Sequence, residues 1–182
     1  MEDISREKLH ISVRKLVEFI FRSGDIDEGQ GSVDPVLSMR EGQRIHKKIQ
    51  ESRNAGYVPE VGLKTLIPFD KYDLLIDGRA DGIQYEPNSN TSESSESDLI
   101  EIPVMVEEIK GTYMDFDRLE EPIYVHLAQA KCYAYILCKD YGIDSINIRM
   151  TYCNLDTEAI KIFEEEYSCD TLIEFWNEVM RI

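Results

Sequence analysis

One short segment, Val104 to Gly111, constrains this chain more than any other, because it is an apolar run that ends in charge. Its pattern predicts a strand, whose side chains alternate between two faces, so Glu108 and Lys110 share one side and Glu107 points to the other. Two residues along a strand span roughly 6.6 Å, which lets the Glu108 carboxylate and the Lys110 ammonium reach the same small site. Glu108-Ile109-Lys110 is also the only Asp/Glu-x-Lys tripeptide in the sequence.

The length and the termini predict a single soluble domain over residues 1–182. A chain of 182 residues can bury a real core, yet is short for two domains. No apolar run approaches the length that spans a bilayer, and the polar N-terminus has no signal-peptide core. We therefore expect a cytoplasmic protein that does not bind membranes.

Charge is unevenly distributed along the chain. The formal net charge of −16 argues against a protein whose whole surface holds nucleic acid, since such surfaces neutralise phosphates with Lys and Arg. Residues 86–121 hold eleven acidic and two basic residues, whereas residues 39–54 hold five basic and two acidic ones. A local basic helix on an acidic body remains compatible with a substrate that carries phosphate.

The four cysteines lie at positions 132, 138, 153 and 169, with no Cys-x-x-Cys pair and no common zinc spacing. We expect four reduced, mostly buried thiols. A disulfide and a metal cluster are the alternatives that the spacing leaves open.

The order of expected elements predicts a mixed α/β fold with a β-sheet flanked by helices. Helices are expected at 12–24, 39–54, 125–141 and 169–181, extended segments at 58–69, 72–76, 77–83, 103–110 and 146–152, and either helix or strand at 160–167. The Ser/Glu/Asn-rich tract at 86–101 cannot bury enough apolar surface to order itself, and predicts a disordered hairpin insertion.

Polar residues on several of these elements converge on the segment described first. They are His46 on the helix at 39–54, Asp81 in Gly78-Arg79-Ala80-Asp81-Gly82, Glu108 and Lys110, and Gln129 with Tyr133 one turn apart on the helix at 125–141. Taken singly, each has a plainer explanation: a semi-buried histidine, a turn cap, a solvated edge pair, or core packing. Carboxylate oxygens are the ligands that hard cations prefer, so the joint pattern favours a metal site.

This ordered set of motifs resembles the PD-(D/E)XK nuclease superfamily, and more narrowly its RecB-like exonuclease branch. Two segments are most similar to the nuclease domain at the N-terminus of Rad3/DinG-type helicases. They are Glu-Ile-Lys-Gly-Thr-Tyr and His-Leu-Ala-Gln-Ala-Lys-Cys-Tyr-Ala-Tyr. The resemblance implies a restriction-endonuclease-like fold. It also implies a metal-dependent deoxyribonuclease, acting as an exonuclease on single strands or ends, and one domain of a longer helicase chain or a partner of a helicase.

The resemblance further implies roles for individual residues. His46, Asp81, Glu108 and the Ile109 carbonyl would hold Mg²⁺ or Mn²⁺, and the histidine shifts the preference toward Mn²⁺. A charged Lys110 would orient the attacking water and stabilise the transition state, with Gln129 and Tyr133 positioning water or DNA. The weaker candidates for contact with phosphate are four basic residues, Arg44, Lys47, Arg79 and Arg118.

Three alternatives compete with this interpretation. A catalytically silent RecB-like module that guides DNA to a helicase would have no chemical reason to keep Asp81, Glu108 and Lys110 together. An acidic interaction domain would not need motifs in this order. A CRISPR-associated RecB-like exonuclease would carry an iron–sulfur cluster with one cysteine ahead of His46, and no cysteine precedes Cys132, so we expect no such cluster.

Overall fold

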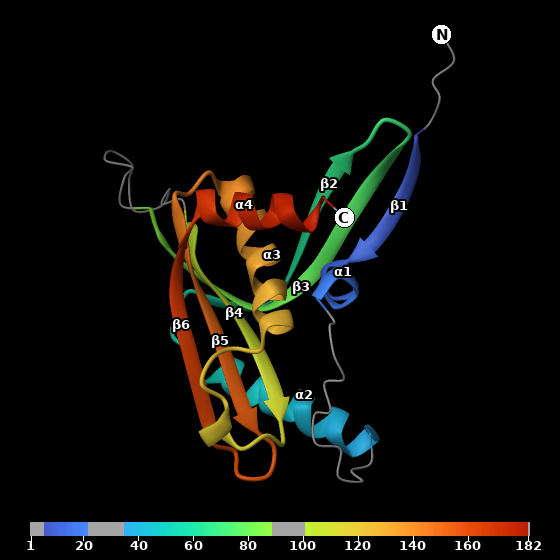
Figure 1. Cartoon of the computed structure of the whole chain (residues 1–182). Coiled ribbons are helices and arrows are strands. Elements are labelled where there is room, and N and C mark those ends of the chain that lie inside the picture. The colour runs from blue at the N-terminus through green and yellow to red at the C-terminus, as the bar shows by residue number, and fades with distance from the viewer. Residues whose placement is uncertain (1–5, 22–34, 89–100, 182) are drawn as a thin grey trace.

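The structure, a computed structural model, describes residues 6–21, 35–88 and 101–181, and the side chains of residues 35–38 are not considered. In chain order the elements are β1 (Glu7–Ser12), α1 (Val13–Phe21), α2 (Pro35–Glu51), β2 (Tyr57–Pro68), β3 (Tyr72–Pro87), β4 (Glu101–Thr112), η1 (Phe116–Arg118), α3 (Tyr124–Tyr141), β5 (Ser145–Asn154), β6 (Ile160–Ser168) and α4 (Cys169–Val179). The predicted mixed β-sheet with flanking helices is confirmed (Figure 1).

Strand β3 is the centre of the six-stranded sheet. One of its edges pairs antiparallel with β2 from Tyr57↔Gln84 to Pro68↔Asp73. Its other edge is shared: β1 runs parallel to the first half, and β4 runs antiparallel to the second half. Beyond β4, the sheet continues with β5, which is parallel to β4, and ends with β6. Because a parallel pair needs a long crossover, α3 connects β4 to β5 across one face.

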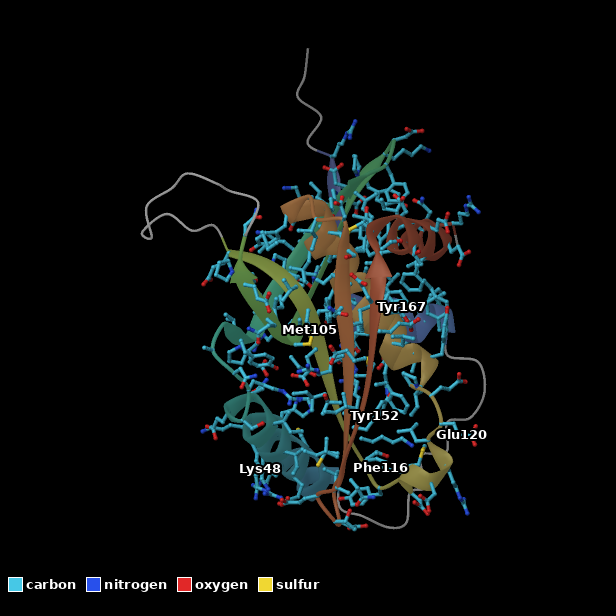
Figure 2. All side chains as sticks on the ribbon, turned by 90° about the vertical axis from the view of Figure 1, so that its left-hand side faces the viewer. Lys48, Met105, Phe116, Glu120, Tyr152 and Tyr167 are labelled. Carbon is cyan, nitrogen blue, oxygen red and sulfur yellow. A yellow bond between two sulfur atoms is a disulfide. The ribbon has the colours of Figure 1, made fainter. Side chains whose placement is uncertain are left out.

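Helices cover the two faces of the sheet unequally. The larger core lies on the face with α1, α3 and α4, and includes Leu16, Ala130, Leu137 and Trp176. On the other face, α2 packs a smaller cluster through Ile45 and Ile49 against Ile109 and Cys153. Figure 2 shows Lys48 of α2 on one side of the sheet and Phe116 and Glu120 on the other. The strand segment with Glu108 therefore lies between two helical layers.

Several predicted boundaries agree with the structure. Ser12 accepts a hydrogen bond from the backbone N–H of Lys15, Ser168 caps α4, and Gly142 ends α3 in the left-handed conformation, with φ of 63°. The open choice for residues 160–167 resolves to a strand, because Ile160–Ser168 pairs along β5.

Other predictions are wrong. Strand β1 was not predicted, and the two extended segments expected at 72–76 and 77–83 form one strand, β3, which runs unbroken from Tyr72 to Pro87. The apolar residues of the helices expected at 12–24 and 39–54 do not all enter the core: Phe19 and Met39 are 79% and 61% exposed, because their helices present other residues to the sheet. The insertion predicted at 86–101 lies mostly outside the described residues and stays a prediction; the strand residues at its two ends pair as Glu86↔Ile102 and Pro87↔Glu101.

The cysteines also require a correction. Cys138, near the end of α3, and Cys169, at the start of α4, form a disulfide with Cα atoms 5.9 Å apart, while Cys132 and Cys153 are free and buried. The expectation of four reduced thiols is wrong because the β5–β6 hairpin brings the start of α4 back to the end of α3. Within the described ranges, no helix is both long and apolar enough to cross a membrane.

Candidate functional site

The candidate site lies where β3 and β4 separate. Their pairing ends at Gly82↔Glu107, after which β3 continues between β1 and β2 while β4 continues beside β5. Asp81 and Glu108 are the first residues past this point on the two strands, and we call the position the fork. Asp81 Oδ2 accepts a hydrogen bond of 2.6 Å from the backbone N–H of Ile109. The carboxylate thus takes the place of a strand partner for that N–H group.

Glu108 is a buried carboxylate whose two oxygens differ in their hydrogen bonds. Its side chain is 2% exposed, and Oε1 accepts hydrogen bonds of 2.7 Å from both Lys110 Nζ and Gln129 Nε2. Oε2 is buried and has no hydrogen-bond partner in the part of the chain that the structure describes. Burial raises the pKa of Glu108 to about 7, although the Lys110 ammonium acts to lower it. A buried carboxylate oxygen without a hydrogen-bond partner is suited to act as a ligand of a cation.

Helix α3 supplies the support for Glu108 from the larger core. Gln129 is buried, and its amide lies 3.4 Å from the Tyr133 hydroxyl, which packs against Gly78. A Cβ at Gly78 would lie 2.6 Å from that hydroxyl, so the close approach requires glycine. His126, also on α3, packs against Tyr152: its Nδ1 lies 3.3 Å from the Tyr152 hydroxyl, and burial lowers the pKa of the ring to about 3.

His46 approaches the fork from α2, on the opposite face. Its Nδ1 lies 3.6 Å from Asp81 Oδ1, and both side chains are partly exposed. Burial lowers the pKa of His46, but the Asp81 carboxylate raises it by more, so the net pKa is above its ordinary value. The structure therefore brings together all six predicted side chains: His46, Asp81, Glu108, Lys110, Gln129 and Tyr133.

Glu60 on β2 joins this group although sequence reasoning missed it. One ligand atom from each of His46, Glu60 and Asp81 lies within 4.8 Å of the other two, and Glu108 is not part of this compact set. Pairing of Pro59 with Gly82 and of Val61 with Ala80 places Glu60 opposite Asp81. Glu60 could therefore have been found only from the β2–β3 register. That register cannot be assigned until the length of the turn between β2 and β3 is known.

Glu107, next to Glu108, has a different environment. It is completely buried, and the Arg53 guanidinium donates to both of its oxygens, with an Nε to Oε2 distance of 3.0 Å. The Thr151 hydroxyl donates a third hydrogen bond at 2.5 Å. This carboxylate has its partners on the face of β4 away from Lys110, as strand alternation predicts.

The four basic residues predicted to contact phosphate lie on three elements: Arg44 and Lys47 on α2, Arg79 on β3 and Arg118 on η1. Arg44 pairs with Glu41 and Glu158, Lys47 with Glu51, and Arg79 with Glu60 at 3.5 Å. These ion pairs are exposed and weak, so they do not prevent contact with DNA. Only Arg79 pairs with a residue at the fork.

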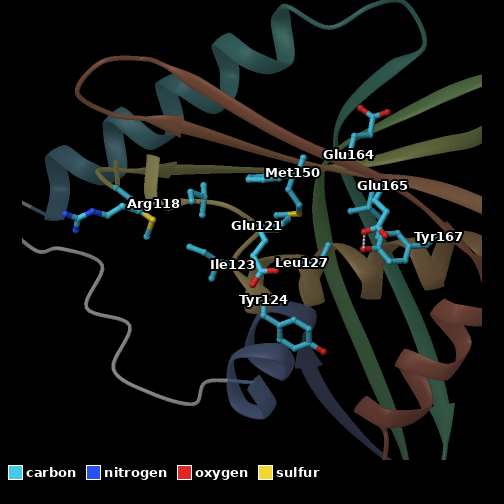
Figure 3. Close-up of a pocket in the computed structure, with 14 residues that line it drawn as sticks. Arg118, Glu121, Ile123, Tyr124, Leu127, Met150, Glu164, Glu165 and Tyr167 are labelled. Carbon is cyan, nitrogen blue, oxygen red and sulfur yellow. Dashed lines mark hydrogen bonds between the residues drawn. The ribbon is translucent and has the colours of Figure 1, made fainter. Parts of the chain in front are cut away.

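Arg118 instead lines a cavity of about 700 Å³ between the 114–127 segment and strands β5 and β6 (Figure 3). The floor of this cavity is apolar, with Leu127 and Met150, and Glu121 and Glu165 lie among its lining residues. A second cavity, of about 810 Å³, is lined by Arg53, Gln84 and Arg149 among others. The fork carboxylates line neither of these two cavities.

Comparisons with solved structures decide the fold. Over 98% of this chain and 78% of the other, the structure is similar to the protein designated SSO0001, with a TM-score of 0.53 and 18% identity. An alkaline exonuclease, LHK-Exo from Laribacter hongkongensis, is similar over 93% of this chain and 84% of its own, with a TM-score of 0.50 and 11% identity. The fold is restriction-endonuclease-like. No protein-family model and no curated protein matches the sequence.

In this restriction-endonuclease-like fold, the fork lies at the centre of the sheet, between the helical layers formed by α2 and α3. Identities of 18% and 11% establish the fold and leave the activity to be argued from the side chains. Asp81 and Glu108 stand on adjacent strands, Lys110 shares the face of Glu108, and His46 reaches the same point from α2. The donor set of carboxylates and one imidazole fits Mg²⁺ or Mn²⁺.

Proposed function

We propose that this protein is a metal-dependent nuclease that hydrolyses phosphodiester bonds in DNA. The observation that carries the proposal is Glu108 Oε2, a buried carboxylate oxygen without a partner among the described residues, next to Asp81 and beside an ammonium group. A purely structural site would leave no such oxygen, because an unsatisfied buried polar group costs roughly 1–3 kcal/mol, and more when it is charged.

Each residue has a part in this proposal. Asp81, Glu108, His46 and the Ile109 carbonyl would hold a divalent cation, which when bound lowers the pKa of water and polarises a phosphoryl oxygen. Gln129 fixes Glu108 through Oε1 and so leaves Oε2 for the cation. Lys110, 2.7 Å from the same Oε1, is placed to orient the attacking water and to stabilise charge on the phosphate. Tyr133 holds Gln129 in place.

The substrate and partners form the finer part of the proposal. The resemblance to RecB-like domains and the fold shared with an alkaline exonuclease both favour an exonuclease that acts on single strands or ends. The similarity to nuclease domains of Rad3/DinG-type helicases favours a helicase in the same or an associated chain. Arg79, which lies beside Glu60 at the fork, is then the best placed of the four basic residues to contact the DNA backbone.

A cleavage assay tests this function. End-labelled single-stranded oligonucleotide is incubated with wild type and with Glu108→Ala, in Mn²⁺, Mg²⁺ or chelator. We expect cleavage by wild type with either metal and none in chelator. Loss of a metal ligand removes several kcal/mol of transition-state stabilisation, so Glu108→Ala should cut about 10³-fold more slowly. Equal cleavage by both proteins, or no cleavage by wild type under any metal, contradicts the proposal.

A further inference from the structure

The face of the sheet that carries α3 holds a cavity that has no part in the catalytic chemistry proposed above. It has a volume of about 700 Å³ and lies between the 114–127 segment and strands β5 and β6 (Figure 3). Ligand pockets in proteins have volumes of about 300–1,000 Å³, with mostly apolar walls and a few polar groups. This cavity has both properties, so it can take one small molecule or one nucleotide of a longer chain.

The cavity lies one strand away from Glu108. Ile148 and Met150 belong to its lining, and in the parallel register of β4 and β5 they are the partners of Val106 and Glu108. Neighbouring strands are about 4.8 Å apart, and paired residues on them point to the same face of the sheet. A DNA strand whose phosphodiester reaches Glu108 can therefore place an adjacent nucleotide in the cavity.

Charged side chains line both ends of the cavity. Figure 3 shows Arg118 at one end, and Glu165 with Tyr167 at the other. Glu165 accepts a hydrogen bond from the Tyr167 hydroxyl. Arg118 and Glu121 have no ion-pair partner in the part of the chain that the structure describes. These two are therefore available to a ligand that offers a negative group and a hydrogen-bond donor.

Aromatic rings complete the lining. Tyr124, Phe163 and Tyr167 all contribute to it, and Tyr124 is 52% exposed although its ring packs edge-on against Phe21. Nucleobases of every kind stack on aromatic side chains. A base that stacks on protein must first leave its neighbours in the strand, which costs least when the strand is already single. The rings therefore favour an unpaired base.

We propose that this cavity binds one unpaired nucleotide next to the phosphodiester that is cleaved. The base stacks on the aromatic rings, Glu121 accepts a hydrogen bond from its exocyclic amino group, and the Arg118 guanidinium contacts a phosphate. Cytosine, adenine and guanine carry such an amino group, whereas thymine does not. The inference rests on the proposed nuclease function. It deepens that function by assigning a single-stranded substrate and a preference against thymine at this position.

A basic, apolar peptide is the competing occupant, because three of the four charged residues in the lining are carboxylates. Two of these already have partners, since Arg149 pairs with one and the Tyr167 hydroxyl donates to the other. Among the described residues, the charges left without a partner are one of each sign, Arg118 and Glu121. A nucleotide offers a group for both, whereas a basic peptide has none for Arg118.

NMR of methyl-labelled methionine measures binding at the cavity itself. Met114 and Met150 line it, whereas Met105 lines the second cavity and is the internal control. The whole chain is titrated in chelator with dCMP, with TMP, and with a peptide of alternating lysine and leucine. We expect dCMP to shift the Met114 and Met150 signals and to leave Met105 unchanged. It should bind about fivefold more tightly than TMP, or better, because thymine offers no donor to Glu121.

Two variants assign the polar contacts. Glu121→Ala should abolish the preference for dCMP over TMP. Arg118→Met should weaken dCMP about tenfold and leave the binding of deoxycytidine, which has no phosphate, unchanged. Glu120→Ala is the matched control, because this exposed carboxylate is the sequence neighbour of Glu121 and does not line the cavity. Circular dichroism verifies that each variant is folded.

Three results would overturn the nucleotide site. One is the absence of any shift at Met150 with either nucleotide. Another is a shift with the lysine–leucine peptide alone, which would assign the cavity to a protein partner. The third is equal affinity for dCMP and TMP, which would remove the role of Glu121. If wild type still cuts single-stranded DNA in Mn²⁺, each of these leaves the proposed function standing, whereas lack of cleavage overturns that function.

Discussion

Glu107 and Glu108 are adjacent in the sequence, both buried, and opposite in character. Arg53 and Thr151 satisfy both oxygens of Glu107 on the α2 face of β4. Glu108 lies on the α3 face, where Lys110 and Gln129 share one oxygen and leave the other without a partner among the described residues. Burial alone therefore does not distinguish the two carboxylates, whereas the number of satisfied oxygens does, and the oxygen of Glu108 that lacks a partner is the one that the proposed function assigns to a cation.

The two carboxylates also act on different parts of the fold. Through Arg53, Glu107 ties the residues that follow α2 to the centre of the sheet, and α2 carries His46 and Gln50. Glu108 ties β4 to α3 through Gln129. The first contact holds α2 in place beside the fork, and the second fixes Oε1 of Glu108, which leaves Oε2 for the proposed cation.

The largest expected effect on stability is at Arg53. Arg53→Met removes the guanidinium partner of the buried Glu107 carboxylate and leaves it the hydrogen bond from the Thr151 hydroxyl, and breaking one side of a buried ion pair costs about 3–5 kcal/mol. Urea unfolding followed by circular dichroism measures the loss. Arg14→Met, which removes an exposed pair with Glu18, is the control and should change the free energy of unfolding by less than about 0.5 kcal/mol. If the two variants lowered the free energy of unfolding equally, the Glu107 ion pair would contribute no more to stability than an exposed one.

The next effect is a gain in stability at Glu108 that depends on pH. A carboxyl group whose pKa is raised to about 7 binds more protons folded than unfolded, so it lowers stability as the pH rises from the ordinary 4.5 through 7. Glu108→Gln removes that charge, and in chelator at pH 8 it should stabilise the fold by on the order of 2 kcal/mol. The gain should vanish below pH 4.5. A gain that grows on acidification is the contrary result.

A smaller effect is expected from the ammonium beside Glu108. Lys110 lowers the pKa of that carboxyl, so Lys110→Met should raise the pKa of Glu108 above 7. Carbon-13 NMR of the glutamate carboxyl groups, titrated in chelator, measures it. Lys71→Met, at an exposed position, should leave the pKa where it is in wild type. A pKa that falls in Lys110→Met would mean that the 2.7 Å contact with Glu108 does not form in solution.

Much of the fold was predictable from the sequence, because its signals are local. Alternation along residues 104–111 separated Glu107 from Glu108, and helical spacing put Gln129 and Tyr133 on one face of α3. Strand β1 escaped prediction because its residues 7–10 are exposed and carry no apolar alternation. Its place in the sheet depends on parallel pairing with β3, more than 60 residues away in the chain.

The parts of the site that were missed depend on contacts between distant segments. Glu60 becomes a candidate only through the β2–β3 register and a positive φ, neither of which its neighbours Pro59 and Val61 reveal. Arg53 meets Glu107 across 54 positions, and the disulfide joins cysteines 31 positions apart. Side-chain roles that follow from tertiary pairing of this kind cannot be derived from spacing along a single strand or helix.

The most direct test of whether Glu108 binds a cation is thermal unfolding. Wild type and Glu108→Gln are each unfolded at pH 8, once in chelator and once in saturating Mn²⁺. The variant should be the more stable protein in chelator. Ligand at 100 times its dissociation constant stabilises a fold by about 2.7 kcal/mol, so wild type should gain more in Mn²⁺ and equal or overtake the variant. A variant that is less stable in chelator, or that gains as much from Mn²⁺ as wild type, contradicts this account.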